Sequence, residues 1–321
     1  MWKAKHSPPA PPSTTTRFTG KTILITGSNT GLGFRAAEYF VALDAGRVIL
    51  GVRTSSKGEA AKAHIEAQTG RKGVVDVMQI DMNNFDYVKA FSAKVEAEVP
   101  KLDIAVLNAG CLASQFSKSS EGFETMIQVN CLSTTLLALL LLPKLCASKP
   151  SGPSTVNTLP RLVIVTSRAY ETIAQSQLPS PAESLIDANN KPFKDHLTQY
   201  AMSKFFIQMN FHSLHELVDG DEILVTSCCP GATQSDLSRD LAVGAIMRFG
   251  VKAFGAVFMR TTEEGSRTLV TACTLSKEAA GKLWRDDKLD KEKVLVTGEE
   301  GNPFRQQLWK ENYRYPSCEG S

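Results

Sequence analysis

Short β-rich apolar runs alternate with longer helical segments along this chain, and this alternation is the feature that most constrains its fold. The predicted strands are residues 21–25, 48–52, 74–80, 103–107, 162–166 and 223–227. The predicted helices are residues 34–43, 56–69, 84–98, 122–146 and 197–217. Strands that are separated by helices form parallel sheets with helices on both faces. The sequence therefore predicts the α/β class: a single doubly wound domain with a mainly parallel sheet.

The ends of the chain and two internal segments interrupt this pattern. Residues 1–17 are rich in proline and threonine and lack the apolar core of a secretory signal, so we expect a flexible tail. The domain is expected to span residues 18–316, with a short tail at 317–321. Residues 148–160 and 170–196 are polar and contain several prolines, which predicts loops. The second loop leads into the last predicted helix and would overhang its start.

Charge and cysteine content exclude several classes of protein. The net charge of +3 is too small to indicate binding to nucleic acid or to a membrane surface. The longest uninterrupted apolar run, residues 136–142, is far shorter than the ~20 residues of a membrane-spanning helix. The seven cysteines include no Cys-x-x-Cys pair and several lie in apolar segments, which indicates a reducing, cytoplasmic location without a zinc site. His212 and His215 could share a metal ion, but the histidines form no metal-ligand pattern, so we favour structural roles.

A glycine-rich turn, Thr26-Gly27-Ser28-Asn29-Thr30-Gly31-Leu32-Gly33, joins the first predicted strand to the first predicted helix. In this position glycines let the backbone approach a pyrophosphate, while the helix N-terminus supplies amide donors and a favourable dipole. The alternative is an ordinary glycine-rich turn, which the strand–turn–helix context disfavours. We therefore predict a Rossmann-type dinucleotide site whose contacts are Gly27, Asn29, Thr30, Gly31, Leu32 and Gly33.

Tyr200 and Lys204 lie four residues apart in the last predicted helix, and therefore on one face of it. A free tyrosine titrates near ~10, and a nearby ammonium group stabilises the phenolate and lowers that pKa. A phenol with a lowered pKa can donate a proton to a ketone or accept one from an alcohol. Such a pair is also common on solvated helices, so its meaning depends on the nucleotide signature upstream.

Motifs in a fixed order place this chain beside a known family. They are the glycine turn, Asp81 after the third strand, Asn108-Ala109-Gly110 after the fourth, Ser167 after the fifth, Tyr200 with Lys204, and Pro230-Gly231 after the sixth. Over about residues 18–315 the chain resembles the short-chain dehydrogenase/reductase family. Val52-Arg53 and Glu263-Glu264-Gly265 resemble its retinol-dehydrogenase-like branch, and in particular the reductases of fungal secondary metabolism.

The resemblance implies a catalytic tetrad of Asn130, Ser167, Tyr200 and Lys204. Asn130 would orient a water molecule and help to hold the lysine; an asparagine that bonds its own helix is the alternative. Ser167 would bond the substrate oxygen, although its neighbour Thr166 competes for this role. Tyr200 would be the general acid/base, and Lys204 would lower its pKa and bind the nicotinamide ribose.

The residues that end the second strand indicate which nicotinamide cofactor binds. An acidic residue there would bond the ribose 2′-hydroxyl of NAD, whereas this chain has Val52 followed by Arg53. A guanidinium group suits a 2′-phosphate, and Lys57 could assist it. The alternative is that Arg53 only begins a polar loop. The missing acid and the added base together favour NADP.

The resemblance implies further cofactor contacts at three strand ends. The residue after the third strand would meet the adenine ring, although it could instead cap a helix. The motif after the fourth strand would pack beside the cofactor, and the amides after the sixth would face the nicotinamide carboxamide. These contacts are Asp81, Asn108, Ala109, Gly110, Pro230, Gly231, Thr233 and Ser235, of which the last is usually threonine in the family.

Residues 236–262 would cover the site as a substrate lid, because family members use this region in that way. The segment is rich in apolar and aromatic residues, so we expect a lipophilic ketone, aldehyde or alcohol as substrate. Alternatively these residues only seal the sheet, and the basic residues among them form a solvated face rather than a membrane contact. The candidates to line a pocket are Leu241, Ile246, Met247, Phe249, Val251, Phe254, Val257 and Phe258.

Three functions remain open from the sequence. The first is an NADP-dependent reductase of a hydrophobic carbonyl, and the second is an alcohol dehydrogenase of the same fold. The third is a nucleotide-binding scaffold without catalysis, against which the intact tetrad argues. The helices predicted at 122–146 and 197–217 carry more apolar residues than one sheet face needs. The resemblance implies that such helices pair in a dimer, so we also expect a homodimer.

Overall fold

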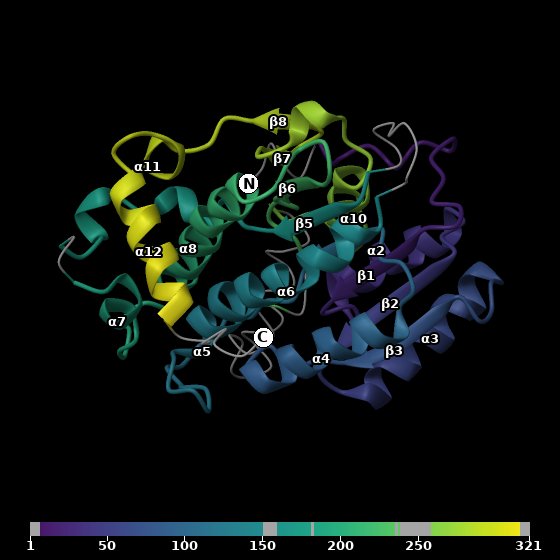
Figure 1. Ribbon diagram of the computed structural model, residues 1–321, viewed down its shortest axis with the longest axis horizontal. Helices are drawn as coiled ribbons and strands as arrows, with labels where there is room; N and C mark the ends of the chain where they lie inside the picture. Colours follow the sequence, from purple (N-terminus) through teal and green to yellow (C-terminus); the bar gives the residue numbers. More distant parts are fainter. Residues whose placement is uncertain (1–6, 150–158, 181–182, 235–236, 238–257, 315–321) are drawn as a thin grey trace.

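The computed structural model describes residues 7–149, 159–180, 183–234, 237 and 258–314. Within these residues eight strands form one sheet in the order β3-β2-β1-β4-β5-β6-β7-β8. They are β1 (Thr22–Thr26), β2 (Arg47–Val52), β3 (Val75–Gln79), β4 (Ile104–Leu107), β5 (Arg161–Val165), β6 (Leu224–Cys228), β7 (Leu283–Arg285) and β8 (Lys288–Asp290). All pairs are parallel except that of β7 with β8 at the edge (Figure 1).

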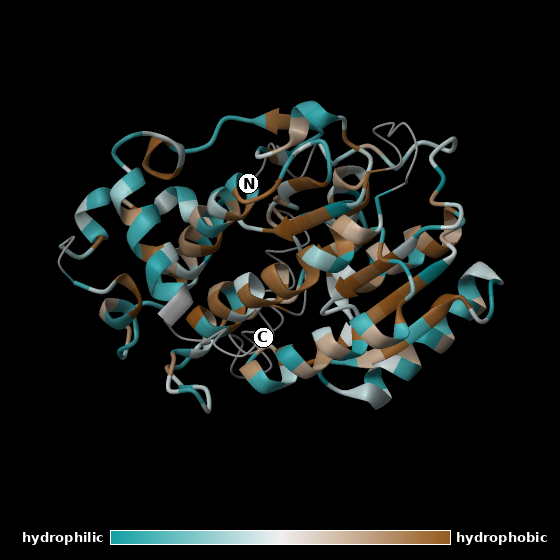
Figure 2. Ribbon diagram, viewed as in Figure 1, coloured by the Kyte–Doolittle hydropathy of each residue, from teal (hydrophilic) through white to brown (hydrophobic). Residues whose placement is uncertain are grey.

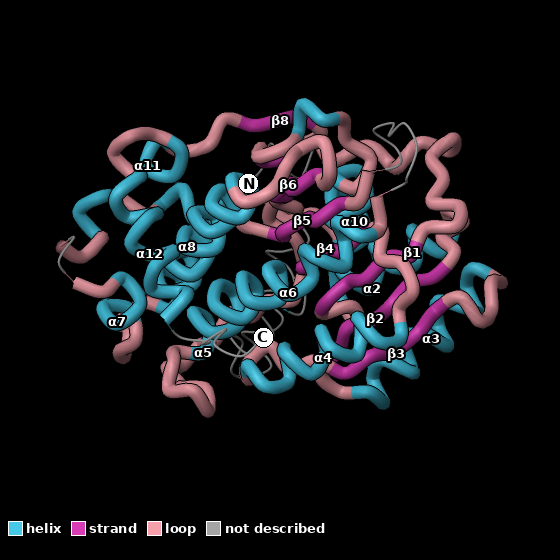
Figure 3. The backbone as a smooth tube through the Cα atoms, viewed as in Figure 1, coloured by secondary structure: helices cyan, strands magenta, loops and turns pink. Residues whose placement is uncertain are grey.

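Helices cover both faces of this sheet, as a doubly wound fold requires. They are α2 (Gly31–Ala42), α3 (Ser55–Thr69), α4 (Phe85–Glu98), α5 (Thr125–Ile127), α6 (Ser133–Ala147), α7 (Leu185–Asn189), α8 (His196–Glu216), α10 (Thr262–Ala272), α11 (Val294–Thr297) and α12 (Asn302–Arg314). The core on one face includes α2, α3 and α10, and the core on the other includes α4, α6 and α8 (Figure 3). The predicted fold class is thus confirmed, with small shifts at the ends of the predicted elements.

Alternating side chains along each strand build the two sides of the core. In β1, Ile23 and Ile25 join the cluster of α2 and α10, whereas Leu24 joins the cluster of α4 and α6. Strands that are buried on both faces are apolar throughout, and they are brown in Figure 2. The carboxyl ends of the parallel strands therefore all reach one edge of the sheet, where the loops can carry a site.

The helix predicted at residues 122–146 is not one regular α-helix. α5 ends at Ile127, residues Gln128–Leu132 form a π-helical turn, and α6 continues from Ser133. Such turns inside helices are frequent at functional sites. The stretch Thr125–Ala147 is apolar enough to cross a membrane, with a mean hydropathy of 1.8, but 78% of that window is buried inside the protein. It packs against α4 and α8 and is therefore a core helix.

The C-terminal segment contributes elements that the sequence did not predict. α11 and α12 pack against α8 (Figure 1), and every residue of α8 from Ala201 to Leu214 is buried. The apolar surplus of α8, from which we expected a homodimer, is therefore covered by the same chain. The loop predicted at 170–196 also contains structure, namely α7 and the 3-10 turns Arg168–Thr172 and Gln175–Gln177.

The N-terminal segment is attached to the domain in its described part, residues 7–17. Arg267 Nη1 donates to Pro9 O at 2.8 Å, and Ala10 N donates to Asp287 Oδ2 at 2.6 Å. The guanidinium group requires acceptors, and a proline-rich segment offers carbonyl oxygens that no secondary structure uses. In the structure this part of the segment thus lies against Arg267 of α10 and against Asp287, between β7 and β8.

Candidate active site

Two glycines of the turn between β1 and α2 lie too close to neighbouring atoms to be replaced by residues with a side chain. Gly27 has a φ of +66°, and a Cβ there would lie 2.9 Å from Ala109 Cα. A Cβ at Gly33 would lie 2.6 Å from Asn108 Nδ2 and 2.8 Å from Gly27 O. α2 begins at Gly31 and has no acidic residue in its first turn. The turn therefore presents backbone amides at the positive end of a helix dipole, which fits the pyrophosphate of a dinucleotide.

The other predicted contacts of this turn are partly exposed. Asn29 lies within the turn, Thr30 occupies the N-cap position of α2, and Leu32 is in the first helical turn. α10 packs against Leu32, because a Cβ at Gly265 would lie 2.9 Å from Leu32 Cδ2 and 2.5 Å from Thr233 Cγ2. α10 thus joins the start of α2 to the loop after β6.

Thr26 ties the glycine turn to the loop after β4. Its Oγ1 accepts from Asn108 N at 3.1 Å and from Ala109 N at 3.0 Å. Asn108 Nδ2 in turn donates to Thr26 O at 2.9 Å and to Gly27 O at 3.2 Å. Thr26 belongs to the glycine signature, but a threonine at the end of a strand has no distinctive pattern that would predict these contacts.

The end of β2 exposes two cations. Val52 is buried, and a Cβ at Gly58 would lie 2.7 Å from its Cγ2, so its side chain points into the core. Arg53 is the first exposed residue after it, and Lys57 is exposed in the first turn of α3, which also lacks an acidic residue. This arrangement fits a phosphate better than a ribose hydroxyl.

Asp81 follows β3 in a turn at the same edge of the sheet. Its Oδ1 accepts from Asn83 N at 2.9 Å. The cap of α4 is instead Asn84, whose Oδ1 accepts from Tyr87 N at 3.1 Å. The alternative reading of Asp81 as a helix cap is therefore wrong.

Ser167 and Tyr200 meet, although 33 positions separate them in the chain. Their hydroxyl groups are hydrogen bonded, and Ser167 Oγ also accepts from Ala169 N at 3.3 Å. The competing Thr166 is buried, and its hydroxyl has no hydrogen-bond partner among the described residues. Of the two neighbours, Ser167 is thus the one that faces the tyrosine.

Burial dominates the titration of the tyrosine–lysine pair. It raises the pKa of the Tyr200 phenol, and the hydrogen bond with Ser167 opposes this rise. Burial also lowers the pKa of Lys204 to about 8. Lys204 Nζ donates to Val165 O at 3.1 Å, at the end of β5. The group that lowers the phenol's pKa is therefore Ser167, whereas we expected Lys204 to do so.

Asn130 lies in the π-helical turn and bonds outside its own helix. Its Oδ1 accepts from Cys111 N at 2.8 Å, and its Nδ2 donates to Cys111 O and to Ser203 Oγ, both at 2.9 Å. A Cβ at Gly110 would lie 3.1 Å from Asn130 Oδ1 and 3.6 Å from Lys204 Nζ. The alternative of an asparagine that bonds its own helix is therefore wrong, and Asn130, Gly110 and Lys204 converge.

Glu124 joins the helix of Asn130 to the helix of Tyr200, a role that the sequence did not predict. It is fully buried, and burial raises its pKa. Its carboxylate accepts from Met126 N, Ile127 N and Gln199 Nε2, each at 3.0 Å. Gln199 directly precedes Tyr200, so this carboxylate fixes the position of the two helices relative to each other.

The loop after β6 brings Pro230 and Gly231 to the same edge. Thr233 Oγ1 donates to Gly231 O at 3.0 Å, and Arg260 Nη1 donates to Pro230 O at 3.1 Å. Ser235 lies outside the described residues. The proposed lid also lies outside them, except for Leu237 and residues 258–262.

Two other features lie apart from this site. His212 Nε2 is 3.0 Å from Glu292 Oε2, but the described residues contain no group of three or more side chains that could hold a metal ion. A cavity of about 430 Å³ lies at the amino ends of β1 and β5, on the opposite edge of the sheet. Its Lys21 already pairs with Asp103 at 3.1 Å, so we assign it no role.

Comparisons with known proteins identify the family of this chain. The sequence profile of short chain dehydrogenases matches residues 21–159. The short-chain dehydrogenase/reductase ffsI of Aspergillus flavipes is 37% identical over 97% of this chain and 89% of its own length. The short-chain dehydrogenase/reductase phmF of Phaeosphaeria nodorum is 36% identical over 92% of this chain and 86% of its own length.

A short chain dehydrogenase of Escherichia coli, solved in complex with NADPH, shares the fold. Its TM-score is 0.61 at 18% identity, over 84% of this chain and 98% of the other. The fungal relatives match nearly the whole length of this chain. The chain therefore belongs to the short-chain dehydrogenase/reductase family of oxidoreductases.

Proposed function

We propose that this oxidoreductase uses NADPH to reduce a lipophilic ketone or aldehyde to the alcohol, in the cytoplasm and in fungal secondary metabolism. The observation that carries the proposal is the hydrogen bond between Ser167 and Tyr200, beside Lys204 and Asn130. The bound nicotinamide supplies the hydride, and the protein supplies position and a proton.

Tyr200 is proposed as the acid and Ser167 as the group that holds the substrate oxygen. Because burial raises the pKa of the phenol, Tyr200 carries its proton at neutral pH, which is the form that reduction requires. The Ser167 hydroxyl can donate to the carbonyl oxygen while Tyr200 delivers its proton to the same atom. The protonated phenol is the form that reduction uses, whereas alcohol oxidation would use the phenolate.

Lys204 is proposed to bind the cofactor beside Tyr200, and Asn130 to hold the loop next to Lys204. Lys204 Nζ is held by Val165 O, close to Gly110, where it could bond the hydroxyl groups of the nicotinamide ribose. Asn130 fixes the backbone of Cys111 through two hydrogen bonds and so shapes the loop next to the ammonium group.

NADP is proposed over NAD because of the cations at the end of β2. Arg53 and Lys57 are both exposed there, next to a helix N-terminus without acidic residues. A charge-assisted bond to the 2′-phosphate would add affinity for NADPH alone. The structural relative solved with NADPH is in keeping with this choice.

An apolar substrate is proposed from the loops that flank Tyr200. Phe116, after β4, and Phe193, before α8, form an edge-to-face pair with centroids 6.3 Å apart. Both rings are half-buried, so they offer apolar surface between these two loops. The aromatic sequence of residues 241–260 agrees with a lipophilic ligand, although that segment lies outside the described residues.

The test is a screen of aliphatic and aromatic ketones and aldehydes, in which the absorbance of NADPH is followed. With any accepted carbonyl, Tyr200→Phe should lower kcat by ~10²–10⁴-fold, because general acid catalysis contributes that much. NADPH affinity, measured by fluorescence titration, should survive in this variant. Near-normal turnover by Tyr200→Phe would refute the assigned acid, and equal affinities of the unmodified protein for NADPH and NADH would refute the cofactor choice.

A further inference from the structure

The turn of the β7–β8 hairpin consists of two adjacent aspartates, both in the left-handed backbone region. Asp286 has a φ of 52° and Asp287 a φ of 57°. A two-residue turn of this kind matches the twist of a hairpin, but it is usually built from asparagine and glycine. Aspartate tolerates the conformation because its short side chain can bond locally. The turn directs consecutive side chains, Arg285 and Asp286, to two different loops of the site.

Asp286 reaches the loop after β6 through a buried arginine. Arg260 is fully buried, and its Nη2 lies 2.5 Å from Asp286 Oδ1. The same guanidinium group donates from Nη1 to Pro230 O at 3.1 Å. A Cβ at Gly231 would lie 2.8 Å from that Nη1, so the arginine lies directly against the turn. A buried guanidinium group keeps its position only when charged and polar partners satisfy it.

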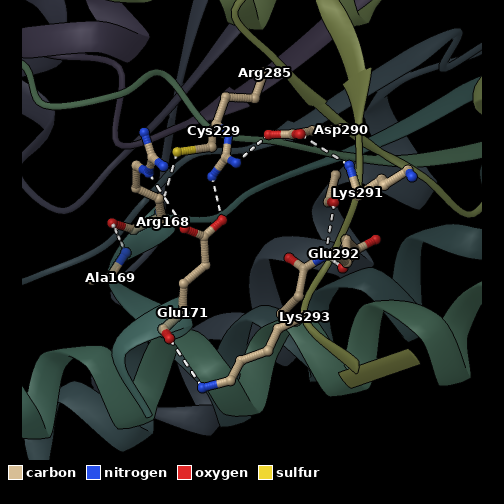
Figure 4. Close-up of polar contacts among 12 residues, drawn as sticks. Arg168, Ala169, Glu171, Cys229, Arg285, Asp290, Lys291, Glu292 and Lys293 are labelled. Atoms are coloured by element: carbon tan, nitrogen blue, oxygen red, sulfur yellow. Dashed lines mark hydrogen bonds and ion pairs between the residues drawn. The ribbon is translucent and has the colours of Figure 1, made fainter. Parts of the chain in front are cut away.

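Arg285 reaches the loop that follows Ser167. It pairs with Glu171, in the 3-10 turn after Ser167, and also with Asp290 of its own hairpin (Figure 4). Lys293, just beyond β8, donates to the backbone carbonyl of Glu171 at 3.0 Å. Figure 4 also shows Arg168 N beside Cys229 Sγ, at 3.2 Å, which joins the two loops directly.

We propose that Arg285 and Asp286 are positioning residues, which set the loop of Ser167 and the loop of Pro230 and Gly231 relative to each other. The inference rests on the proposed function, in which the first loop holds the substrate oxygen and the second meets the nicotinamide. One rigid turn fixes both loops, because its two residues are adjacent in the chain. Substituting Asp286 should therefore weaken the binding of NADPH alone, and substituting Arg285 should weaken the binding of the carbonyl substrate alone.

The experiment tests the contacts of Asp286 and those of Arg285 separately. Asp286→Asn keeps the shape and the left-handed backbone but removes the charge that holds Arg260, so the dissociation constant of NADPH should rise about tenfold. Arg285→Met frees the loop of Ser167, so the KM for the carbonyl should rise about tenfold while NADPH affinity is retained. A role in stability alone would lower the melting temperature in both variants without this split.

Matched controls lie in the same hairpin. Asp287→Asn makes the same change at the next residue, whose carboxylate bonds only Ala10 N in the described contacts. Lys288→Met makes the same kind of change at the residue that pairs with Arg285 across the hairpin. Both controls should keep NADPH affinity and KM within about twofold. Equal losses in Asp286→Asn and Asp287→Asn would overturn the proposal.

A second variant covers the case in which Asp286→Asn does not fold. In Arg260→Met/Asp286→Asn the buried charge is removed together with its partner, an exchange that is often neutral for stability. This protein should fold, yet it should still bind NADPH about tenfold more weakly, because Pro230 O has lost its donor. Unchanged NADPH affinity in a folded double variant would refute the proposed role of Asp286 and Arg260.

A measurement without nucleotide separates this inference from the proposed function. In Asp286→Asn the amides of Gly231 and Thr233 should exchange hydrogen faster than in the unmodified protein, while those of Gly27 to Gly33 should not change. If the unmodified protein binds neither NADPH nor NADH, the proposed function fails, but the exchange rates still decide the inference. Equal exchange at Gly231 in both proteins would refute it.

Discussion

The carboxyl ends of the parallel strands form one edge of the sheet, and the loops in the two halves of this edge are held in place by contacts of different kinds. In the nucleotide half, residues 18–110, a strand end bonds the neighbouring strand end, as Thr26 bonds the amides of Asn108 and Ala109. In the substrate half, residues 161–314, the loops are held by buried or half-buried charges from the C-terminal segment, such as Arg260 and Arg285. The first half is thus built by short contacts between loops, and the second by charges that arrive from far along the chain.

This difference predicts how each half fails. Changes in the nucleotide half should affect one ligand and leave stability almost unchanged, because its functional cations are exposed. Changes in the substrate half should cost stability, because removing one partner leaves a buried polar group unsatisfied.

The largest effect is expected at Arg53, in the nucleotide half. Arg53→Ala should weaken NADPH binding by about 10–100-fold, the range for a hydrogen bond to a charged group, and leave NADH binding unchanged. Fluorescence titration with both nucleotides measures this. Lys89→Ala, which removes an exposed cation from α4, is the matched control and should change neither. A loss of unfolding free energy in Arg53→Ala would break the comparison between the halves.

A second effect, on stability, is expected at Glu311, in the substrate half. From α12 this buried carboxylate accepts from Leu185 N and Ile186 N, both at 3.0 Å, and so caps α7. Glu311→Ala leaves both amides unsatisfied and should lower the free energy of unfolding by about 1–3 kcal/mol. Urea denaturation measures the loss, and proteolysis of residues 170–196 should accelerate.

The control for this prediction is Glu300→Ala, which removes an exposed carboxylate just before α12. It should unfold with the same free energy as the unmodified protein. Equal stability of Glu311→Ala and Glu300→Ala would mean that α7 does not depend on α12, and the substrate half would then resemble the nucleotide half.

The same difference explains what could be predicted from the sequence. The strands, most helices and the glycine turn follow from local periodicity and spacing, and the turn's fit against Asn108 agrees with that reading. Ser167 and Tyr200 were chosen through the order of motifs, and the structure brings their hydroxyl groups together. These features are encoded in short stretches of chain.

The rest depends on partners that no local pattern reveals. Glu171, Arg260 and Arg285 look like ordinary surface charges in the sequence, and only the fold pairs them. The rise in the pKa of Tyr200 has the same origin, because burial is a property of the folded chain and not of the spacing to Lys204. The π-helical turn at Asn130 is likewise invisible to a periodicity of 3.6.

The smallest effect concerns pH and Lys204. Burial lowers the pKa of this lysine from 10.5 to about 8 in the folded protein. Between these values the unfolded chain binds more protons than the folded chain, so the free energy of unfolding should increase with pH. Below pH 8 both states carry the charge, and this residue contributes no slope. The increase should reach about 1–2 kcal/mol, after allowance for relaxation around the buried charge.

Urea denaturation from pH 7 to pH 10, without nucleotide, measures this increase. Lys204→Met should lack it, because the side chain cannot titrate. Lys57→Met should retain it, because that substitution removes an exposed cation from the nucleotide half, whose burial does not change on folding. If the free energy of unfolding changed with pH in the same way in the unmodified protein and in Lys204→Met, the ammonium group of Lys204 would not be desolvated. The substrate half would then hold one buried charge fewer than the comparison between the halves requires.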